Sequence, residues 1–333
     1  MVLQALLNGL VEASIIVLAA VGLSLLYGVK KFANFAHGDM MTVGAYFALY
    51  VMGTTRGGLV VGILSAMIFL AFLGILFEFF IFARLEGRGP VAPLVASVGL
   101  ALILQNALRS VFGTTLVTYG IQLPESWIFG IRDPFTGYGL RLNPIQDFLP
   151  MVLAFALVLF VALLLRYTKL GKAMRATSDN PDLARVSGIN VAGVRYATWA
   201  LSGALAGAGG FVLAIKLPSF DPLLGSSILL LVFSAVILGG IGSAYGAMLG
   251  ALVIGVTRNL FFPFATSVGI PTEFSLIVPF GIMVLVLLVR PQGLAGRPIG
   301  FDLPPLRAEL RKLWRTFARF WGRLFARIRR RLA

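Results

Sequence analysis

The sequence predicts an all-α integral membrane protein that crosses the bilayer several times. Hydrophobic residues make up 59% of the 333-residue chain and charged residues only 12%, whereas soluble domains carry about 45–50% and about 25%. Apolar stretches close to the length that spans a bilayer as a helix, about 20 residues, recur along the chain. These stretches are residues 3–27, 59–83, 91–112, 148–165, 196–215, 244–262 and 274–289, with two shorter ones at 40–52 and 226–239.

The distribution of basic residues predicts how these segments are oriented. Most Lys and Arg residues fall in the loops after residues 27, 83 and 165 and in the tail after residue 290, and positive charge in short loops marks the cytoplasmic side. The N-terminus is then outside, the C-terminus is cytoplasmic, and the number of crossings is odd. About nine transmembrane segments, within a range of eight to ten, fit if both shorter stretches cross as short or broken helices.

The chain divides into a transmembrane domain, residues 1–290, and a basic tail, residues 291–333. Apolar residues and arginines alternate along the tail with helical period, which predicts an amphipathic helix in contact with membrane lipid on the cytoplasmic side. A solvated or coiled-coil helix is the alternative. The tail supplies most of the net charge of +15, so this charge does not indicate a nucleic-acid partner.

Two long connections join the apolar stretches. The first, at about 113–147, is rich in Gly, Pro and aromatic residues and is predicted to cover the external mouth. The second, at about 166–195, is predicted to project into the cytoplasm and to contain a short polar helix. Asp179 or Asn180 can cap its N-terminus, Pro181 suits its first position, and Gly188 can end it.

The motifs of several enzyme classes are absent from the sequence. One histidine cannot form an H-E-x-x-H zinc site, there is no G-x-S-x-G elbow, and there is no cysteine to bind a metal. Gly171-Lys172 lacks the flanking residues of a phosphate-binding loop. The sequence therefore predicts a protein that is not an enzyme and has no metal, no cofactor and no ATPase site. The glycine clusters at 205–210 and 238–246 more often permit close helix packing.

Two carboxylates fall within the apolar stretches. Glu12 lies well inside the first one, and a carboxylate at that depth is expected to face the bundle interior or a water-filled path. Glu12 is therefore a candidate to line a substrate path, with a protonated or paired structural role as the alternative. Glu78, near the inner end of its stretch, is expected to be structural and to reach the membrane interface or Arg84.

The only histidine lies in the stretch FANFAHGD, residues 32–39. The apolar residues 40–52 that follow would form a helix of about 20 Å, shorter than the roughly 30 Å of a bilayer core, so this helix is predicted to start below the membrane surface. Gly38 is expected to permit a sharp turn and Asn34 or Asp39 to cap the helix. These residues and His37 are candidates for the substrate path or its inner gate. A purely structural role is the alternative, since one His–Asp pair offers too little chemistry for an enzyme.

Several stretches resemble the membrane permease subunits of ABC importers for branched-chain, or hydrophobic, amino acids. They are LSLLYGVKKFANFAHGDMMTVGAY, GKAMRATSDNPDLARVSGINV, DPLLG at 221–225, AVILGGIGSAYGAMLGALVIG, and RPQGLAG at 290–296. Their order and spacing make the resemblance specific, and it covers about residues 7–296. The NFAHGD form is more similar to the first of the two paired permeases in such systems than to the second.

The resemblance implies a multi-pass transport subunit in the cytoplasmic (inner) membrane of a prokaryote, acting on branched-chain or related small amino acids. The implied partners are a second permease subunit, two cytoplasmic ATPase subunits and an external substrate-binding protein. The inner loop would dock on the ATPase. The residues that carry this implied coupling role are Arg175, Asp179, Pro181, Asp182, Leu183, Arg185 and Gly188.

The external side and the substrate are less specified. Lys216 and Asp221 are candidates to face the binding protein, on the ground of position. One alternative function is an ABC permease for urea or short amides. Another is an ion-coupled secondary transporter that works through Glu12 or Asp39 and needs no ATPase partner.

Overall fold

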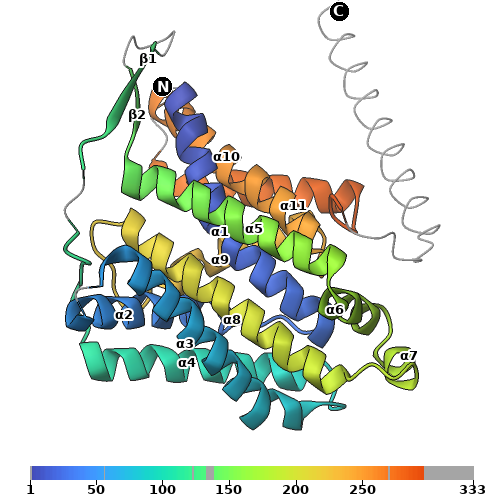
Figure 1. Ribbon diagram of the computed structural model, residues 1–333. Helices are drawn as coiled ribbons and strands as arrows, with labels where there is room; N and C mark the ends of the chain where they lie inside the picture. Colours follow the sequence, from blue (N-terminus) through green and yellow to red (C-terminus); the bar gives the residue numbers. More distant parts are fainter. Residues whose placement is uncertain (1, 56, 122–123, 133–138, 269–270, 296–333) are drawn as a thin grey trace, which may run out of the picture. The chain divides into compact units, whose positions relative to one another are not determined.

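The apolar stretches form helices in the computed structural model, which describes residues 2–55, 57–121, 124–132, 139–268 and 271–295 (Figure 1). The described α-helices are α1 (Val2–Lys30), α2 (His37–Thr55), α3 (Gly58–Phe80), α4 (Val91–Phe112), α5 (Leu149–Tyr167), α6 (Lys169–Asp179), α7 (Pro181–Val186), α8 (Val191–Lys216), α9 (Leu224–Gly239), α10 (Ala244–Val268) and α11 (Ile277–Val289). Three shorter helical segments accompany them, at Phe82–Leu85, Pro144–Phe148 and Thr272–Leu276. The chain is thus an all-α polytopic membrane protein. Most of the predicted tail, residues 296–333, lies outside the described residues, and its membrane contact stays a prediction.

Helices α1 and α8 form the interior of the bundle. In each of them 83% of the most apolar 18-residue stretch is buried, compared with 22–28% of the corresponding stretches in α3, α4, α5 and α10. Helix α1 packs mainly against α10 and α8, and α8 packs mainly against α3, α1 and α2. Large apolar side chains on the outer helices, such as Ile68 and Phe155, are exposed, as expected for surfaces that a bilayer covers.

Glycine lets α8 approach α3 closely. A Cβ added at Gly207 would lie 2.6 Å from the carbonyl oxygen of Ala66, and one added at Gly74 would lie 2.6 Å from that of Trp199. Neither distance is possible for a real Cβ, so only glycine fits at these two crossings. The predicted packing role of the cluster at 205–210 is therefore confirmed.

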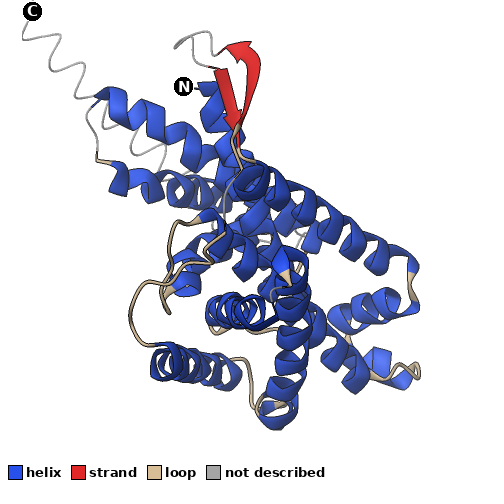
Figure 2. Ribbon diagram, turned by 60° about the vertical axis from the view of Figure 1, so that its left-hand side comes forward, coloured by secondary structure: helices blue, strands red, loops and turns tan. Residues whose placement is uncertain are grey.

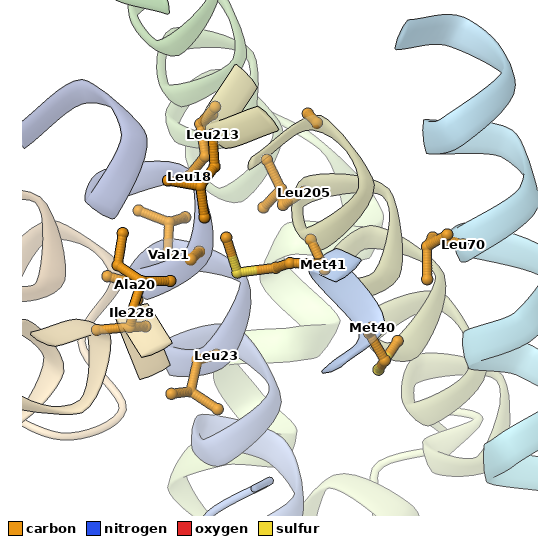
Figure 3. Close-up of a cluster of buried hydrophobic side chains, with 14 of the residues drawn as sticks. Leu18, Ala20, Val21, Leu23, Met40, Met41, Leu70, Leu205, Leu213 and Ile228 are labelled. Atoms are coloured by element: carbon orange, nitrogen blue, oxygen red, sulfur yellow. The ribbon is translucent and has the colours of Figure 1, made fainter. Parts of the chain in front are cut away.

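The interior of the bundle is closed by large apolar side chains. Met41 of α2 points into a cluster that includes Leu18 of α1 and Leu205 and Leu213 of α8 (Figure 3). All four side chains are at most 8% exposed. The unbranched methionine fills an irregular gap between helices of different direction.

Helix α2 differs from its prediction. It begins at His37 and ends at Thr55, with 19 residues instead of the 13 predicted over 40–52, and at about 1.5 Å per residue it approaches the thickness of a bilayer core. The prediction was wrong because it followed apolarity alone. His37 and Asp39 continue the helix since the helices packed around them bury both side chains. The irregular backbone is confined to the residues between α1 and α2.

The connection at about 113–147 contains the two β-strands found among the described residues. Strands β1 (Trp127–Arg132) and β2 (Gly139–Leu142) form an antiparallel hairpin in which Trp127 pairs with Leu142. The hairpin stands beside the N-terminal end of α1 in both views (Figure 2). The side-chain amide of Gln4 fixes it there by exchanging two 3.0 Å hydrogen bonds with the backbone of Arg141. We call this the hairpin end of the bundle.

Helices α6 and α7 lie at the other end, which we call the α7 end. There α1 finishes, α8 begins, and the short linker between α3 and α4 crosses over. The predicted helix in this loop is confirmed: the side chain of Asn180 caps α7 by accepting 3.0 Å hydrogen bonds from the backbone N–H groups of Asp182 and Leu183. Pro181 occupies the first position. Gly188, with φ of +81°, ends the turn that follows.

Candidate functional site

The turn between α1 and α2 is built by Lys31 and Asn34. Lys31 takes a left-handed conformation with φ of 58°, and its N–H donates to the carbonyl oxygen of Tyr27. The side chain of Asn34 accepts a 3.1 Å hydrogen bond from the N–H of Ala36. The backbone carbonyl oxygen of Asn34 accepts another from the N–H of His37. The predicted capping role of Asn34 is thus confirmed. The carboxylate of Asp39, in the first turn of α2, lies within reach of its own backbone N–H.

His37 is buried in the first turn of α2. Its side chain is 0% exposed, and it fits beside α1 because Gly22 has no side chain: a Cβ there would lie 3.2 Å from His37 Cε1. The ring lies against the backbone of Ala19 in α1, and neither ring nitrogen makes a hydrogen bond of good geometry with the residues that the structure describes. Within the same residues no three His, Cys, Asp or Glu side chains gather as a metal site would require.

Asp39 links α2 to α4. Its side chain is 1% exposed, and its carboxylate accepts a 2.9 Å hydrogen bond from the amide of Gln105. Sequence reasoning did not find Gln105, because the two residues are 66 positions apart. The bond holds two membrane helices together at a polar point. His37 and Asp39 therefore have separate environments and do not form a pair.

Gly38 serves close packing instead of the predicted sharp turn. It lies inside α2, and a Cβ there would lie 2.6 Å from the carbonyl oxygen of Gly225 at the start of α9. The N–H of Gly225 donates a 2.9 Å hydrogen bond to the hydroxyl of Thr42. The prediction failed because the partner of Gly38 is distant in the sequence. The start of α2 and the start of α9 thus touch backbone to backbone.

Glu12 is paired across the interface of α1 and α10. Its carboxylate accepts hydrogen bonds from the guanidinium group of Arg258 and the amide of Asn259. The side chains of Glu12 and Arg258 remain 17% and 27% exposed. Sequence reasoning missed both partners, although an Arg-Asn dipeptide inside an apolar segment was a signal that could have found them.

The α7 end presents an exposed loop. Of the side chains of α7 only that of Ala184 is buried, while Leu183 is 63% and Val186 is 86% exposed. Arg175 of α6 is exposed as well. Two apolar side chains on a short polar helix, outside the membrane-spanning segments, form a surface suited to docking on another protein.

Ion pairs connect the helices and the linker next to this loop. Glu78 of α3 pairs with Lys30 at 2.8 Å, and not with Arg84 as expected from the sequence. Arg195, near the start of α8, pairs with Glu86 of the linker between α3 and α4. Burial lowers the pKa of the Lys31 ammonium group next to this region, and the carboxylate of Asp179 partly opposes that change.

The hairpin end carries the other candidates. Lys216, the last residue of α8, forms an ion pair with Asp147 before α5. Asp221 accepts a 3.0 Å hydrogen bond from the N–H of Leu223 and so shapes the turn into α9. Tyr119 donates a 3.0 Å hydrogen bond to the carbonyl oxygen of Ala45, and burial raises the pKa of its phenol. The structure places the two sequence candidates at one end, but not in contact with each other.

Comparison with known proteins gives one consistent family. Residues 5–287 match the family model for the branched-chain amino acid transport system permease component. The chain is 29% identical over 304 residues to the high-affinity branched-chain amino acid transport system permease protein LivH of Escherichia coli strain K12, covering 89% of this chain and 96% of LivH. It is 30% identical over 304 residues, with the same coverage, to BraD of Pseudomonas aeruginosa, which has the same description. The similarity to LivM of Escherichia coli is 27% over 321 residues, covering 89% and 69%.

Proposed function

We propose that the protein is a transmembrane subunit of an ABC importer. The chain belongs to the family of permease components of branched-chain amino acid transport systems. It forms part of the path by which branched-chain or related small amino acids enter a prokaryotic cell through the cytoplasmic membrane. The family match, which runs through nearly the whole helical bundle, is the observation that carries this proposal. The names of LivH and BraD support the substrate class.

The importer contains further subunits. Because the chain is similar to both LivH and LivM, its permease partner is a related chain of the LivM kind, and this chain takes the LivH place. Two ATPase subunits supply the energy, since the sequence has no phosphate-binding loop of its own. An external binding protein delivers the amino acid.

Helix α7 is the contact with the ATPase. The capping by Asn180 and the proline at the first position preform this short helix, so it loses little conformational freedom when it docks. Leu183 and Val186 supply exposed apolar contacts. Asp182 and Arg185, both exposed, surround them with charge.

The α7 end is cytoplasmic in this proposal, and the hairpin end is external. The basic residues of the inner loop support this orientation. Among the described residues, six helices are long and apolar enough to cross a membrane, and α9 and α11 are shorter apolar helices. If the 19-residue α2 also crosses, nine membrane segments result in this proposal, which puts the N-terminus outside and the C-terminus in the cytoplasm.

The junction of α1 and α2 borders the inner gate. Asn34, His37 and Asp39, on either side of Gly38, bring polar side chains into an apolar interior, where polar groups without well-formed hydrogen bonds are costly. Water or substrate would satisfy them when the helices separate. Uptake by His37→Ala and Asp39→Asn in assembled complexes tests this role: a gate predicts impaired uptake in at least one, whereas normal uptake in both leaves only a structural role.

Glu12 lies beside the path in the same proposal. The cluster of Glu12, Arg258 and Asn259 is partly exposed in the single subunit, and lipid is a poor environment for exposed charge. It therefore faces water or the second permease. At the hairpin end, Lys216 and Asp221 are placed to meet the binding protein.

One experiment separates this function from its alternatives. Cells that express the complete importer should take up radiolabelled leucine, and unlabelled isoleucine and valine should compete for this uptake. ATP depletion should stop the uptake, whereas an uncoupler that leaves ATP intact should not. Competition by urea or acetamide instead would identify an amide permease. Collapse with the uncoupler alone would identify an ion-coupled transporter.

A further inference from the structure

Charged side chains form a continuous chain from α7 to the helices inside the bundle. Its order is Arg185 of α7, Glu86 of the linker between α3 and α4, Arg195 of α8, Glu78 of α3 and Lys30 of α1. We call it the Glu86 chain. Of these five residues, only Arg185 was expected from the sequence to take part in coupling.

Four contacts make up the Glu86 chain. Arg185 lies 3.6 Å from Glu86, and Arg195 bonds Glu86 directly. Arg195 lies also 3.9 Å from Glu78. At the inner end the ammonium group of Lys30 lies 2.8 Å from Glu78. Each carboxylate is therefore shared by two cations on different elements.

Burial follows the same order. The side chains of Arg185 and Glu86 are 56% and 46% exposed, whereas those of Arg195, Lys30 and Glu78 are 14%, 7% and 1% exposed. An exposed ion pair is weak and can break and reform, but a buried charge cannot leave its partner without a large cost. The outer end of the chain can thus move while the inner end stays bound.

Apart from its direct connections to α6 and α8, α7 makes few contacts with the bundle. Only Ala184 of its side chains is buried, and among the residues that the structure describes the contact of Arg185 with Glu86 is its one ion pair with another element. The linker that carries Glu86 joins α3 to α4, and α3 is the helix that packs most extensively on α8.

We propose that Glu86 is a positioning residue that transmits the displacement of α7 to α3 and α1, because it joins the cation of α7 to the cation at the start of α8. This role rests on the proposed function, in which α7 docks on the ATPase. When α7 moves, Arg185 pulls Glu86 with it through their ion pair. The buried pairs of Arg195 and Lys30 with Glu78 then make α8, α3 and α1 move together.

The test measures coupling in the assembled importer, reconstituted in proteoliposomes. The variant is Glu86→Gln, which keeps the shape of the side chain and removes the charge. Arg88→Gln is the matched control, since Arg88 lies in the same linker, is exposed, and forms no ion pair with a described residue. Glu86→Asp keeps the charge and serves as the conservative variant. Leucine uptake and ATP hydrolysis are measured on the same vesicles.

Transmission through Glu86 predicts that ATP hydrolysis by Glu86→Gln stays within about twofold of the wild type while uptake per ATP falls by about 2- to 30-fold, the range typical of residues in coupling networks. Glu86→Asp should retain most of the uptake, and Arg88→Gln should match the wild type. Arg195→Gln should lower uptake per ATP as well, and the double variant Glu86→Gln with Arg195→Gln should be no worse than the poorer single one.

Three results overturn the proposal. Normal uptake per ATP in Glu86→Gln shows that the residue transmits nothing. An equal fall in ATP hydrolysis and uptake, or loss of the assembled complex, shows that it only holds the loop in place. Fully additive effects of Glu86→Gln and Arg195→Gln show that the two act separately. If the wild-type complex itself shows no ATP-driven uptake, the proposed function fails instead.

Discussion

The buried pair of Lys30 and Glu78 gives a prediction whose size follows from burial. The two side chains are 7% and 1% exposed and lie 2.8 Å apart. Replacing Glu78 with leucine leaves an ammonium group buried without its partner, which typically costs about 3–5 kcal/mol. Arg195 is less affected, because it keeps its bond to Glu86. We therefore expect Glu78→Leu to lower the free energy of unfolding by about this amount.

The double variant Lys30→Leu with Glu78→Leu is the matched control. Replacing both members of a buried pair by apolar side chains is often neutral or stabilising, so this variant should unfold within about 1 kcal/mol of the wild type. Unfolding is followed in detergent by tryptophan fluorescence during heating, and the single variant should have an apparent Tm lower by at least about 5 °C. A single variant as stable as the wild type, or a double variant as unstable as the single one, would show that Lys30 and Glu78 do not depend on each other as a buried ion pair.

Three further changes have defined expectations. Gly38→Val should lower the yield of folded protein and the free energy of unfolding by about 1–3 kcal/mol, because the new side chain would overlap the backbone at Gly225. The control Gly99→Val should be tolerated, since nothing lies within 4 Å of a Cβ added there. Equal effects of the two changes would contradict the close packing of Gly38. Glu12→Gln should weaken the contact of α1 with α10 by about 1–3 kcal/mol, since Arg258 loses its counter-ion; an unchanged Tm in detergent argues against it. Leu183→Cys, in a chain without native cysteine, should form a cross-link to the ATPase with a bifunctional reagent, whereas efficient labelling by an impermeant thiol reagent in the assembled complex would show that α7 stays free.

The parts of the molecule that sequence reasoning anticipated depend on local signals. Asn180 and Pro181 are adjacent to the helix that they start, and Gly188 ends its turn by its own conformation. The cap at Asn34 is local too, since it bonds a residue two positions away. Such contacts are fixed by chain geometry and leave a pattern that can be read in a few residues.

The parts that it missed depend on contacts between distant segments. Gly38 was assigned to a turn because its neighbour at Gly225 is invisible from the local sequence. The partner of Glu78 is 48 residues away, and that of Glu12 is 246 residues away. In an apolar bundle many polar side chains could reach a given carboxylate, and only the packing of the helices selects one.

The most direct test of the central claim is leucine uptake by the purified importer in sealed vesicles without any ion gradient. The vesicles contain both permeases and the ATPase subunits, and the binding protein is added on the side of the hairpin end. We expect uptake only when ATP is supplied on the side of α7, and none with a nucleotide that cannot be hydrolysed. Leucine uptake driven by a proton or sodium gradient in the absence of ATP would contradict it.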